Sequence, residues 1–227
     1  MTPPSRPQRL RLLYGKSEAV RYLSNLDLMR LWERAARRAD LPLAYSQGFH
    51  PQPKINNAQA LPLGCEGERE VLDIWLTEPW PPEDVWVRLQ RALPPAVPLH
   101  QVTEVDLKAP SLQSLVDQAD YRGHVWTAQP EAVIQERIRM LLAASSLLRQ
   151  RRKKKGGEVV PYDLRPLVRA LAWGGREDGW AVLRMRLCLA PGATGRPDEG
   201  LAALGLGDAP CRFVRERLYF REEKTPA

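Results

Sequence analysis

Residues 21–64, RYLSNLDLMRLWERAARRADLPLAYSQGFHPQPKINNAQALPLG, contain the strongest fold signal in the chain. They predict an amphipathic helix over residues 26–39, because apolar residues recur along one helical face. That face carries Leu28, Leu31, Trp32, Ala35 and Ala39. Ser24, three residues before Asp27, predicts a capping-box-like start, since the serine hydroxyl can accept from a free backbone N–H. Pro42 is expected to end the helix, because the residue before a proline disfavours the helical region.

The loop after this helix carries the side chains best suited to contact a ligand. Gly48 and the prolines around it predict an irregular path. Histidine is a common general acid or base, so His50 could play that role, with Tyr45 or Lys54 as its companion. Tyr45 and Phe49 could instead stack on nucleobases or belong to the core. The alternatives are ligand contact without catalysis, which a lone histidine favours over catalysis, and a hydrogen bond from His50 to the backbone of its own loop.

The first half of the chain, residues 8–108, predicts one domain. Residues 70–77 alternate with Leu72, Ile74 and Leu76 on one side, the period of a strand with one apolar face. The expected elements are a strand at 9–16, the helix at 26–39, a strand within 43–60, a strand at 70–77, a helix at 82–93 and a strand at 97–107. This βαββαβ order is the ferredoxin-like arrangement, with both helices on one face and the other face open.

The second half, residues 115–221, predicts the same order after a linker at residues 109–118. Its elements are a strand at 119–127, a helix at 130–144, a hairpin of residues 164–173 and 180–189, a helix at 196–204 and a strand at 212–220. Val133 and Ile134 are expected in its core, and residues 174–179 in the hairpin turn. The predicted fold is therefore α+β, with two tandem ferredoxin-like halves and antiparallel sheets.

The charge of the chain favours an anionic partner. The net charge is +7. Residues 1–110 hold 14 Lys and Arg against 13 Asp and Glu, and residues 111–227 hold 20 against 14. A surplus of basic residues in one half most often indicates nucleic-acid binding, although it can also do no more than keep the protein in solution. The candidate RNA-binding residues are a basic run, Arg149, Arg151, Arg152, Lys153, Lys154 and Lys155, and the helix row Arg30, Arg34, Arg37 and Arg38, with Lys54 beside them.

The remaining sequence features predict that the chain binds no cofactor or metal and does not contact a membrane. Cys65, Cys188 and Cys211 lie too far apart for a zinc pattern or a three-cysteine iron–sulfur site. The sequence contains neither a Walker loop nor a Rossmann glycine pattern. Apolar runs stay well below the ~20 residues that a membrane span needs. The N-terminus lacks a signal-peptide core, so we expect a cytoplasmic protein.

The run RYLSNLDLMRLWERAARRADLPLAYSQGFHPQPKI…ALPLG, followed later by YDLRPLVRAL and GRPDEGLAALGL, closely resembles the signature of the radical-SAM-linked protein family. These are bacterial proteins fused to or encoded beside radical SAM proteins, and the resemblance covers most of the chain. The motif positions are Asn25, Asp27, Gly48, Phe49, His50, Pro51, Asp163, Arg165 and Pro166. The family pattern usually has histidine at the position of Asn25, so a role for that histidine does not transfer. Asp163 and Arg165 are more typical of a turn lock or ion pair than of catalysis.

These features predict an RNA- or ribonucleoprotein-binding accessory of a radical SAM enzyme, acting in RNA modification or processing. The resemblance implies the radical SAM partner, and the absent cluster cysteines exclude the radical enzyme itself. One alternative is a metal-independent RNA endonuclease that uses His50 with Tyr45 or Lys54. Another is a protein-interaction scaffold whose charge is incidental.

Overall fold

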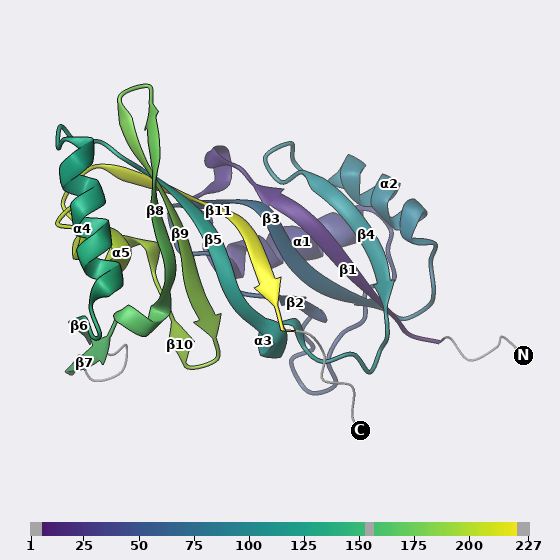
Figure 1. Ribbon diagram of the computed structural model, residues 1–227. Coiled ribbons are helices and arrows are strands. Elements are labelled where there is room, and N and C mark those ends of the chain that lie inside the picture. Colours follow the sequence, from purple (N-terminus) through teal and green to yellow (C-terminus); the bar gives the residue numbers. More distant parts are fainter. Residues whose placement is uncertain (1–5, 153–156, 222–227) are drawn as a thin grey trace, which may run out of the picture. The chain divides into compact units, whose positions relative to one another are not determined.

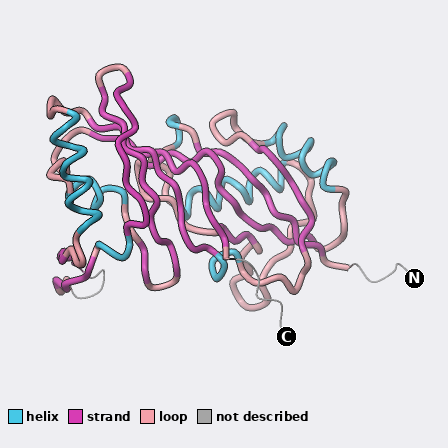
Figure 2. The backbone as a smooth tube through the Cα atoms, in the orientation of Figure 1, coloured by secondary structure: helices cyan, strands magenta, loops and turns pink. Residues whose placement is uncertain are grey.

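The computed structural model describes residues 6–152 and 157–221, with the side chain of Arg152 left out, and these residues form two compact units. Unit 1 runs to Val116 and includes Phe220 and Arg221, and unit 2 comprises Asp117–Tyr219. Both units mix helices with mostly antiparallel strands (Figures 1 and 2), so the predicted α+β class is confirmed. In the described part of the chain, no helix has the length and apolar character needed to cross a bilayer.

Unit 1 is built on a sheet in the order β2-β3-β1-β4, in which each neighbouring pair is antiparallel. Its elements are β1 (Gln8–Lys16), a 3-10 turn (Glu18–Val20), α1 (Asn25–Arg38), β2 (Ile55–Asn57), β3 (Cys65–Leu76), α2 (Pro82–Ala92), β4 (Leu99–Val105) and α3 (Leu112–Leu115). The predicted strand over residues 70–77 is the second half of β3. Alternation fixes which of its side chains face the core.

The core of unit 1 lies between this sheet and the helices α1 and α2. Leu72, Ile74 and Leu76 are buried there, as predicted, and Trp32 of α1 meets Tyr14 of β1 edge to face at 5.0 Å. Figure 1 shows α1 behind the strands of this sheet. The amphipathic stripe of the helix therefore supplies the layer that covers the apolar face of β1 and β3.

Helix α1 begins as predicted and ends by a different device. Ser24 Oγ accepts a hydrogen bond from the Asp27 N–H at 3.1 Å. At the other end Asp40 takes a left-handed φ of 53°, and the Leu41 N–H bonds back to the Ala36 carbonyl at 3.1 Å. This is a Schellman turn, so the helix ends before Pro42 and does not need the proline to stop it.

The opposite face of the unit 1 sheet, which was predicted to be open, is covered around Asp73. Asp73 is fully buried there and Arg9 nearly so, and Arg9 Nη2 lies 2.6 Å from Asp73 Oδ2. Arg9 also donates to the carbonyls of Ala109 and Pro110. Residues 109–118 are therefore not a free linker, because their first two carbonyls bind a buried arginine and the rest includes α3.

Unit 2 carries a sheet in which β9, β5 and β11 are neighbours, with β8 and the short β10 also paired to β9. Its elements are β5 (Val116–Val125), α4 (Glu131–Ala143), β6 (Leu148–Arg152), β7 (Val159–Asp163), a 3-10 turn (Arg165–Leu167), β8 (Val168–Glu177), β9 (Trp180–Ala190), β10 (Ala193–Thr194), α5 (Pro197–Ala203) and β11 (Cys211–Phe220). Strands β6 and β7 form a separate hairpin.

Two details of unit 2 correct the sequence prediction. Ile134 is fully buried but Val133 is 40% exposed, because the apolar stripe of α4 is narrower than its composition suggests. The β8–β9 hairpin forms, yet its turn is Asp178-Gly179 alone. Gly174 and Gly175 lie inside β8, where the register shifts between Trp173 and Arg176. Adjacent glycines therefore mark a β-bulge rather than the turn.

Candidate nucleic-acid interface

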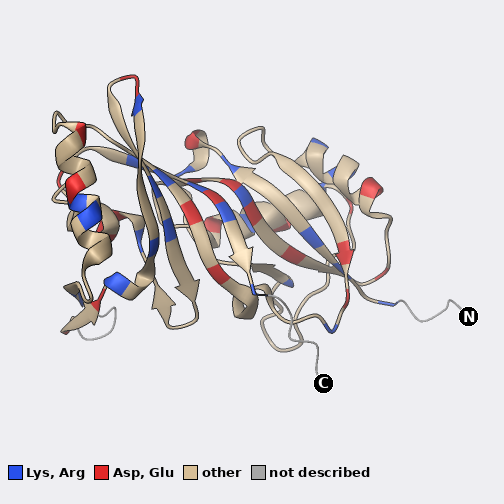
Figure 3. Cartoon of the chain, in the orientation of Figure 1, with Lys and Arg blue, Asp and Glu red and all other residues tan. Residues whose placement is uncertain are grey.

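One face of the unit 2 sheet carries arginines from neighbouring strands. Asp120 pairs with Arg186, and Arg122 pairs with Arg184, across β5 and β9. Alternation turns these four side chains away from the buried Tyr121, Leu183, Met185 and Leu187. We call this surface the arginine face and define it as Ala170 and Ala172 of β8, Arg184 and Arg186 of β9, Asp120 and Arg122 of β5, and Glu216 of β11. Figure 3 shows positive and negative residues along these strands.

The arginine face is hollowed beside β8. A pocket of about 310 Å³ is lined by Asp120, Tyr121, Ala170, Ala172, Arg184, Met185, Arg186 and Glu216. Ala170 and Ala172 pair with Arg186 and Arg184 in the sheet. Because alanine is short, the guanidinium groups rise above β8 on one side and leave space for a ligand.

Arg186 and Asp120 form the most regular ion pair of this surface. Arg186 Nε and Nη2 donate to the two Asp120 oxygens at 2.7 and 2.8 Å, and the Tyr219 hydroxyl donates to Asp120 Oδ2 at 2.7 Å. The bonds from Arg186 and Tyr219 lower the pKa of Asp120, and the bond to Asp120 raises the pKa of Arg186. A carboxylate stabilised in this way is a weak base, so the arrangement favours binding over proton abstraction.

Two further arginines share one carboxylate. Arg122 Nη1 lies 2.6 Å from Glu216 Oε1, and Arg184 Nη1 lies 3.7 Å from the same oxygen. The Arg184 side chain is 56% exposed, which leaves its guanidinium accessible to solvent. Three arginines against two carboxylates give the arginine face a positive surplus.

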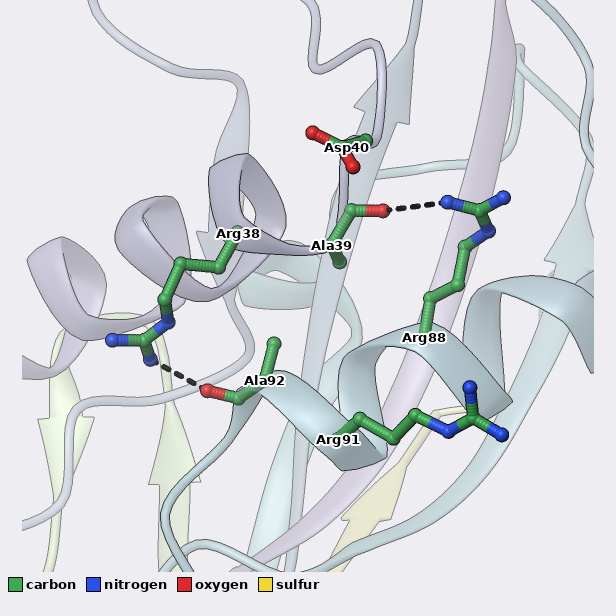
Figure 4. A pocket seen from close by; sticks show the side chains of 6 residues that line it. All are labelled: Arg38, Ala39, Asp40, Arg88, Arg91 and Ala92. Atoms are coloured by element: carbon green, nitrogen blue, oxygen red, sulfur yellow. Dashed lines mark hydrogen bonds between the residues drawn. The ribbon is translucent and has the colours of Figure 1, made fainter.

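A second basic hollow lies in unit 1, where the last turns of α1 and α2 meet (Figure 4). Arg38 donates to the carbonyl of Ala92, and Arg88 donates to the carbonyl of Ala39 at 3.2 Å. The two guanidinium groups thus satisfy backbone carbonyls at the C-terminal ends of the helices. Those ends carry partial negative charge, which opposes anion binding. The hollow is therefore better explained by helix capping than by a phosphate site.

Comparison with known families shows which family the chain belongs to. The model of a family described as "Uncharacterized protein conserved in bacteria (DUF2344)" matches residues 9–197. The chain belongs to this family. The predicted motif residues from Asn25 to Pro166 all lie inside the DUF2344 match. No curated protein sequence matches the chain.

Solved structures similar to this DUF2344 chain include a protein complex and an RNA-bound assembly. One is a Cbf5–Nop10–Gar1 complex, at 13% identity and a TM-score of 0.49, covering 95% of this chain and 50% of that one. Another is an H/ACA RNP bound to a substrate RNA containing 2′-deoxyuridine, at 12% identity and a TM-score of 0.46, covering 96% and 50%. The chain spans half the length of these solved chains.

The predicted arginine row of α1 is partly neutralised in the DUF2344 fold. Arg30 lies 3.5 Å from Asp27, and Arg37 lies 2.7 Å from Glu33. Arg38 caps α2, as described above. Arg34 is exposed and has no ion-pair partner among the residues that the structure describes. The row therefore presents fewer free cations than its sequence spacing suggests.

The three residues of the nuclease hypothesis are not joined by hydrogen bonds among the described residues. The Tyr45 hydroxyl donates to Glu33 at 3.2 Å and accepts from Arg37 at 3.1 Å. The hydrogen bond that Arg37 donates to Tyr45 raises the pKa of Arg37. His50 and Lys54 are exposed. The hydroxyl that was to assist His50 is thus occupied by side chains of α1.

The loop that carries His50 projects into solvent. The Ser46 N–H donates to the Gln52 carbonyl at 2.8 Å, which closes the loop at its base. Gly48 has a φ of 131°, a conformation that favours glycine, and Phe49 is fully exposed. Phe49 is therefore not a core residue and remains free to meet a ligand.

The described residues of the predicted basic run lie on β6. Arg151 lies over the Tyr162 ring at 5.4 Å, and Arg149 pairs with Tyr162 in the hairpin. Burial, with a smaller contribution from Glu199, raises the pKa of Tyr162 to about 12. Lys153, Lys154 and Lys155 lie outside the described residues, as does the side chain of Arg152. Among the side chains of the run that the structure describes, Arg151 is exposed and Arg149 is half-buried.

The remaining motif residues serve local structure. Asp163 Oδ1 accepts the N–H groups of Leu147 and Arg165 at 2.7 and 2.9 Å, and these bonds lower the pKa of Asp163. Arg165 donates to the carbonyls of Leu142 and Val168, and Pro166 lies in the 3-10 turn after β7. Asn25 Oδ1 accepts from the side-chain amide of Asn57 at 2.6 Å, which ties α1 to β2.

The sequence prediction missed the arginine face, although a signal for it was present. Charged residues recur at every second position in two segments, at Asp120 and Arg122 and at Arg184 and Arg186. Such alternation marks the solvent side of a strand. In the part of the chain described here, no three His, Cys, Asp or Glu side chains gather as a metal ion would require.

Proposed function

We propose that this chain is an RNA-binding accessory protein that contacts phosphates through the arginine face. The observation that carries the proposal is the hollow beside β8, where Arg184 and Arg186 rise above two alanines. Guanidinium groups bind phosphate oxygens through two parallel hydrogen bonds, and an open sheet face admits an extended chain. Its hollow is lined by Arg184, whose side chain is 56% exposed. In the hollow of unit 1, by contrast, Arg38 and Arg88 already donate to carbonyls at the helix ends.

The ion pairs on this face hold the arginines in place, and their carboxylates also compete with a phosphate for them. Asp120 fixes the Arg186 guanidinium, and Glu216 fixes that of Arg122. An arginine that is already ordered loses less side-chain entropy when a phosphate arrives. Arg184 has only the long contact to Glu216 and would make the first new phosphate contact.

Other basic residues would make separate phosphate contacts. Arg149 and Arg151 would do so from the β6–β7 hairpin, and Arg30, Arg34, Arg37, Arg38 and Lys54 from unit 1. The proposal also includes Arg152, Lys153, Lys154 and Lys155. The contacts that Arg37 and Arg38 already make reduce their expected share. Phosphate contacts of this kind give affinity without base specificity.

The finer architecture belongs to the same proposal. We assign a ferredoxin-like βαββαβ arrangement to each of the predicted domains, residues 8–108 and 115–221. The order β2-β3-β1-β4 in unit 1 supports this assignment, as does the order β8-β9-β5-β11 in unit 2, where the β6–β7 hairpin is inserted. The accessory role beside a radical SAM protein is supported by the resemblance of the residue 21–64 motif.

The endonuclease alternative rests on the exposure of His50. An exposed imidazole on a projecting loop is accessible to RNA, and Lys54 is exposed as well. The hydrogen bonds of the Tyr45 hydroxyl to Glu33 and Arg37 leave Lys54 as the better second group. A scaffold role would require neither the arginine face nor His50.

A charge-matched pair of variants tests RNA binding. Arg184→Ser removes the exposed guanidinium of the arginine face, and Arg139→Ser removes one from α4 that is 76% exposed. Fluorescence anisotropy with a labelled single-stranded RNA, measured over a salt series, should show weaker binding for Arg184→Ser. The salt slope should flatten by about 0.7 for one lost phosphate contact. Equal behaviour of the two variants would remove the arginine face as the binding site.

A further inference from the structure

Two tryptophans extend the arginine face at one end. Along β9, Trp180 lies on the same side as Arg184 and Arg186, because its position differs from theirs by four and six. Trp126 follows β5 two residues after His124, which pairs with Val182 of β9. The two rings meet edge to face, with centroids 5.5 Å apart and an interplanar angle of 66°. The aromatic pair thus lies on the side of the sheet that carries the arginines, beyond the buried Val182 and His124.

The Trp126 ring is unusually exposed for its size, at 54%. Tryptophan exposed to this degree leaves much apolar surface in water, which costs free energy unless a ligand covers it. The Arg212 guanidinium lies over the Trp180 ring at 5.6 Å, so a cation accompanies the aromatic pair. An aromatic surface beside a guanidinium suits a nucleobase attached to a phosphate.

The β8–β9 turn holds the aromatic pair in place. Gly179 has a φ of 83°, and a Cβ at this position would come within 3.0 Å of the Trp126 ring. Arg176 donates to the carbonyls of Thr127 at 3.0 Å and Gln129 at 2.8 Å. These contacts join the turn to the segment after β5. Trp126 therefore rests against a defined backbone while its outer surface stays exposed.

We infer that Trp126 and Trp180 form a base-stacking platform, and that the ligand of the arginine face is single-stranded nucleic acid with unpaired bases. This inference rests on the proposed function and narrows its substrate class. Stacking requires a free base face, which a continuous duplex does not offer. The backbone would follow the arginines along β9 while one base covers Trp126.

The test compares two RNA probes of equal length and label: an unstructured single strand and a blunt-ended duplex. Trp126→Ala should weaken binding of the single strand by about 5- to 160-fold, the range for loss of one stacked base. It should leave duplex binding unchanged. Trp126→Phe should restore most of the single-strand affinity, because it keeps an aromatic face. Tyr22→Ala removes an aromatic ring that is 68% exposed in unit 1 and serves as the matched control.

The outcomes separate this inference from the proposed function. If Arg184→Ser weakens single-strand binding but Trp126→Ala does not, the platform is wrong and the RNA-binding proposal stands. If Trp126→Ala weakens both probes equally, the single-strand assignment is wrong. If neither variant changes binding, the arginine face fails as well. Circular dichroism and the Trp126→Phe variant distinguish loss of stacking from loss of folding.

Discussion

Arg186 donates to both carboxylate oxygens of Asp120 across the neighbouring strands β9 and β5, at 2.7 and 2.8 Å. The pair stabilises the sheet and also holds one guanidinium of the proposed RNA site in place. The same carboxylate competes with a phosphate for that guanidinium. Stability and RNA affinity should therefore respond in opposite directions when Asp120 changes.

Asp120→Asn should lower the free energy of unfolding by roughly 1–2 kcal/mol, because it removes a charged acceptor from a partly exposed pair. It should also strengthen RNA binding, since Arg186 is released and a negative charge is lost. Urea denaturation and RNA anisotropy measure the two effects on the same sample. A variant that loses both stability and RNA affinity would show that preorganisation by Asp120 outweighs competition.

The stability effect of Asp120 should depend on pH. The pKa of this carboxyl is lower in the folded protein than in the unfolded chain, where it is about 3.9. Its contribution to stability is thus fully present above that unfolded value and is lost as pH falls through the folded pKa. The stability difference between wild type and Asp120→Asn should shrink below about pH 4. A difference that is independent of pH would contradict the ion-pair explanation.

Asp73→Ala should destabilise unit 1 by about 3–5 kcal/mol, the cost of leaving a buried charge without its partner. Arg9 is 2% exposed and would keep the carbonyls of Ala109 and Pro110 and the Trp75 ring, none of which carries a full negative charge. Urea midpoints measure the loss. The control is Glu136→Ala, whose carboxylate is 48% exposed and should matter little. Similar small shifts for both variants would mean that water reaches the Arg9 site.

Ile74→Ala should cost roughly 2–5 kcal/mol, because it opens a cavity in the core between β3 and the helices. Val133→Ala removes fewer atoms from a side chain that is 40% exposed, and should stay within about 0.5 kcal/mol. Thermal or chemical unfolding of the two variants provides the measurement. A large effect at Val133 would indicate that the exposed edge of α4 is covered by a partner.

Arg151→Ser tests the basic hairpin separately from the arginine face. The Arg151 guanidinium lies over Tyr162 and is exposed, so its loss should leave the fold intact. RNA affinity should fall and the salt slope should flatten by about 0.7, as for one phosphate contact on a single strand. Arg139→Ser provides the charge-matched control. An unchanged slope would assign the hairpin to a role other than phosphate binding.

His50→Ala separates the accessory role from the nuclease alternative. For an accessory, the change should weaken RNA binding by at most ~1–2 kcal/mol, and wild type should not cut RNA without metal. For a nuclease, the same change should slow metal-independent cleavage by roughly 10²–10⁴-fold. Denaturing gels with a 2′-deoxy substrate as control give the answer. Cleavage lost in His50→Ala would replace the accessory role with catalysis.

Much of the fold could be predicted because its signals are local. The stripe through Leu28 and Trp32 predicts α1, and the alternation around Ile74 predicts β3. Each pattern reports which side of an element must leave water, and burial enforces it. The capping serine at residue 24 is likewise a local property of the backbone.

The candidate site could be predicted only in part, because it depends on pairs of distant residues. The sequence directed attention to the loop around His50 and to the basic run near Arg151. No local sequence pattern indicated that Asp73 would accept hydrogen bonds from Arg9, 64 positions earlier. This pair covers part of a sheet face that was expected to be open. An arginine and an aspartate that form a buried ion pair look the same in the sequence as a pair that is exposed.

The sequence by itself determined the helices, the main strands, the class of the fold and the positive surplus of the second half. Tertiary structure alone decided that Arg186 meets Asp120, that Arg122 meets Glu216 and that Trp126 rests on Gly179. The physical reason is strand register. Alternation states that a side chain faces solvent, but pairing between segments decides which other side chains stand beside it.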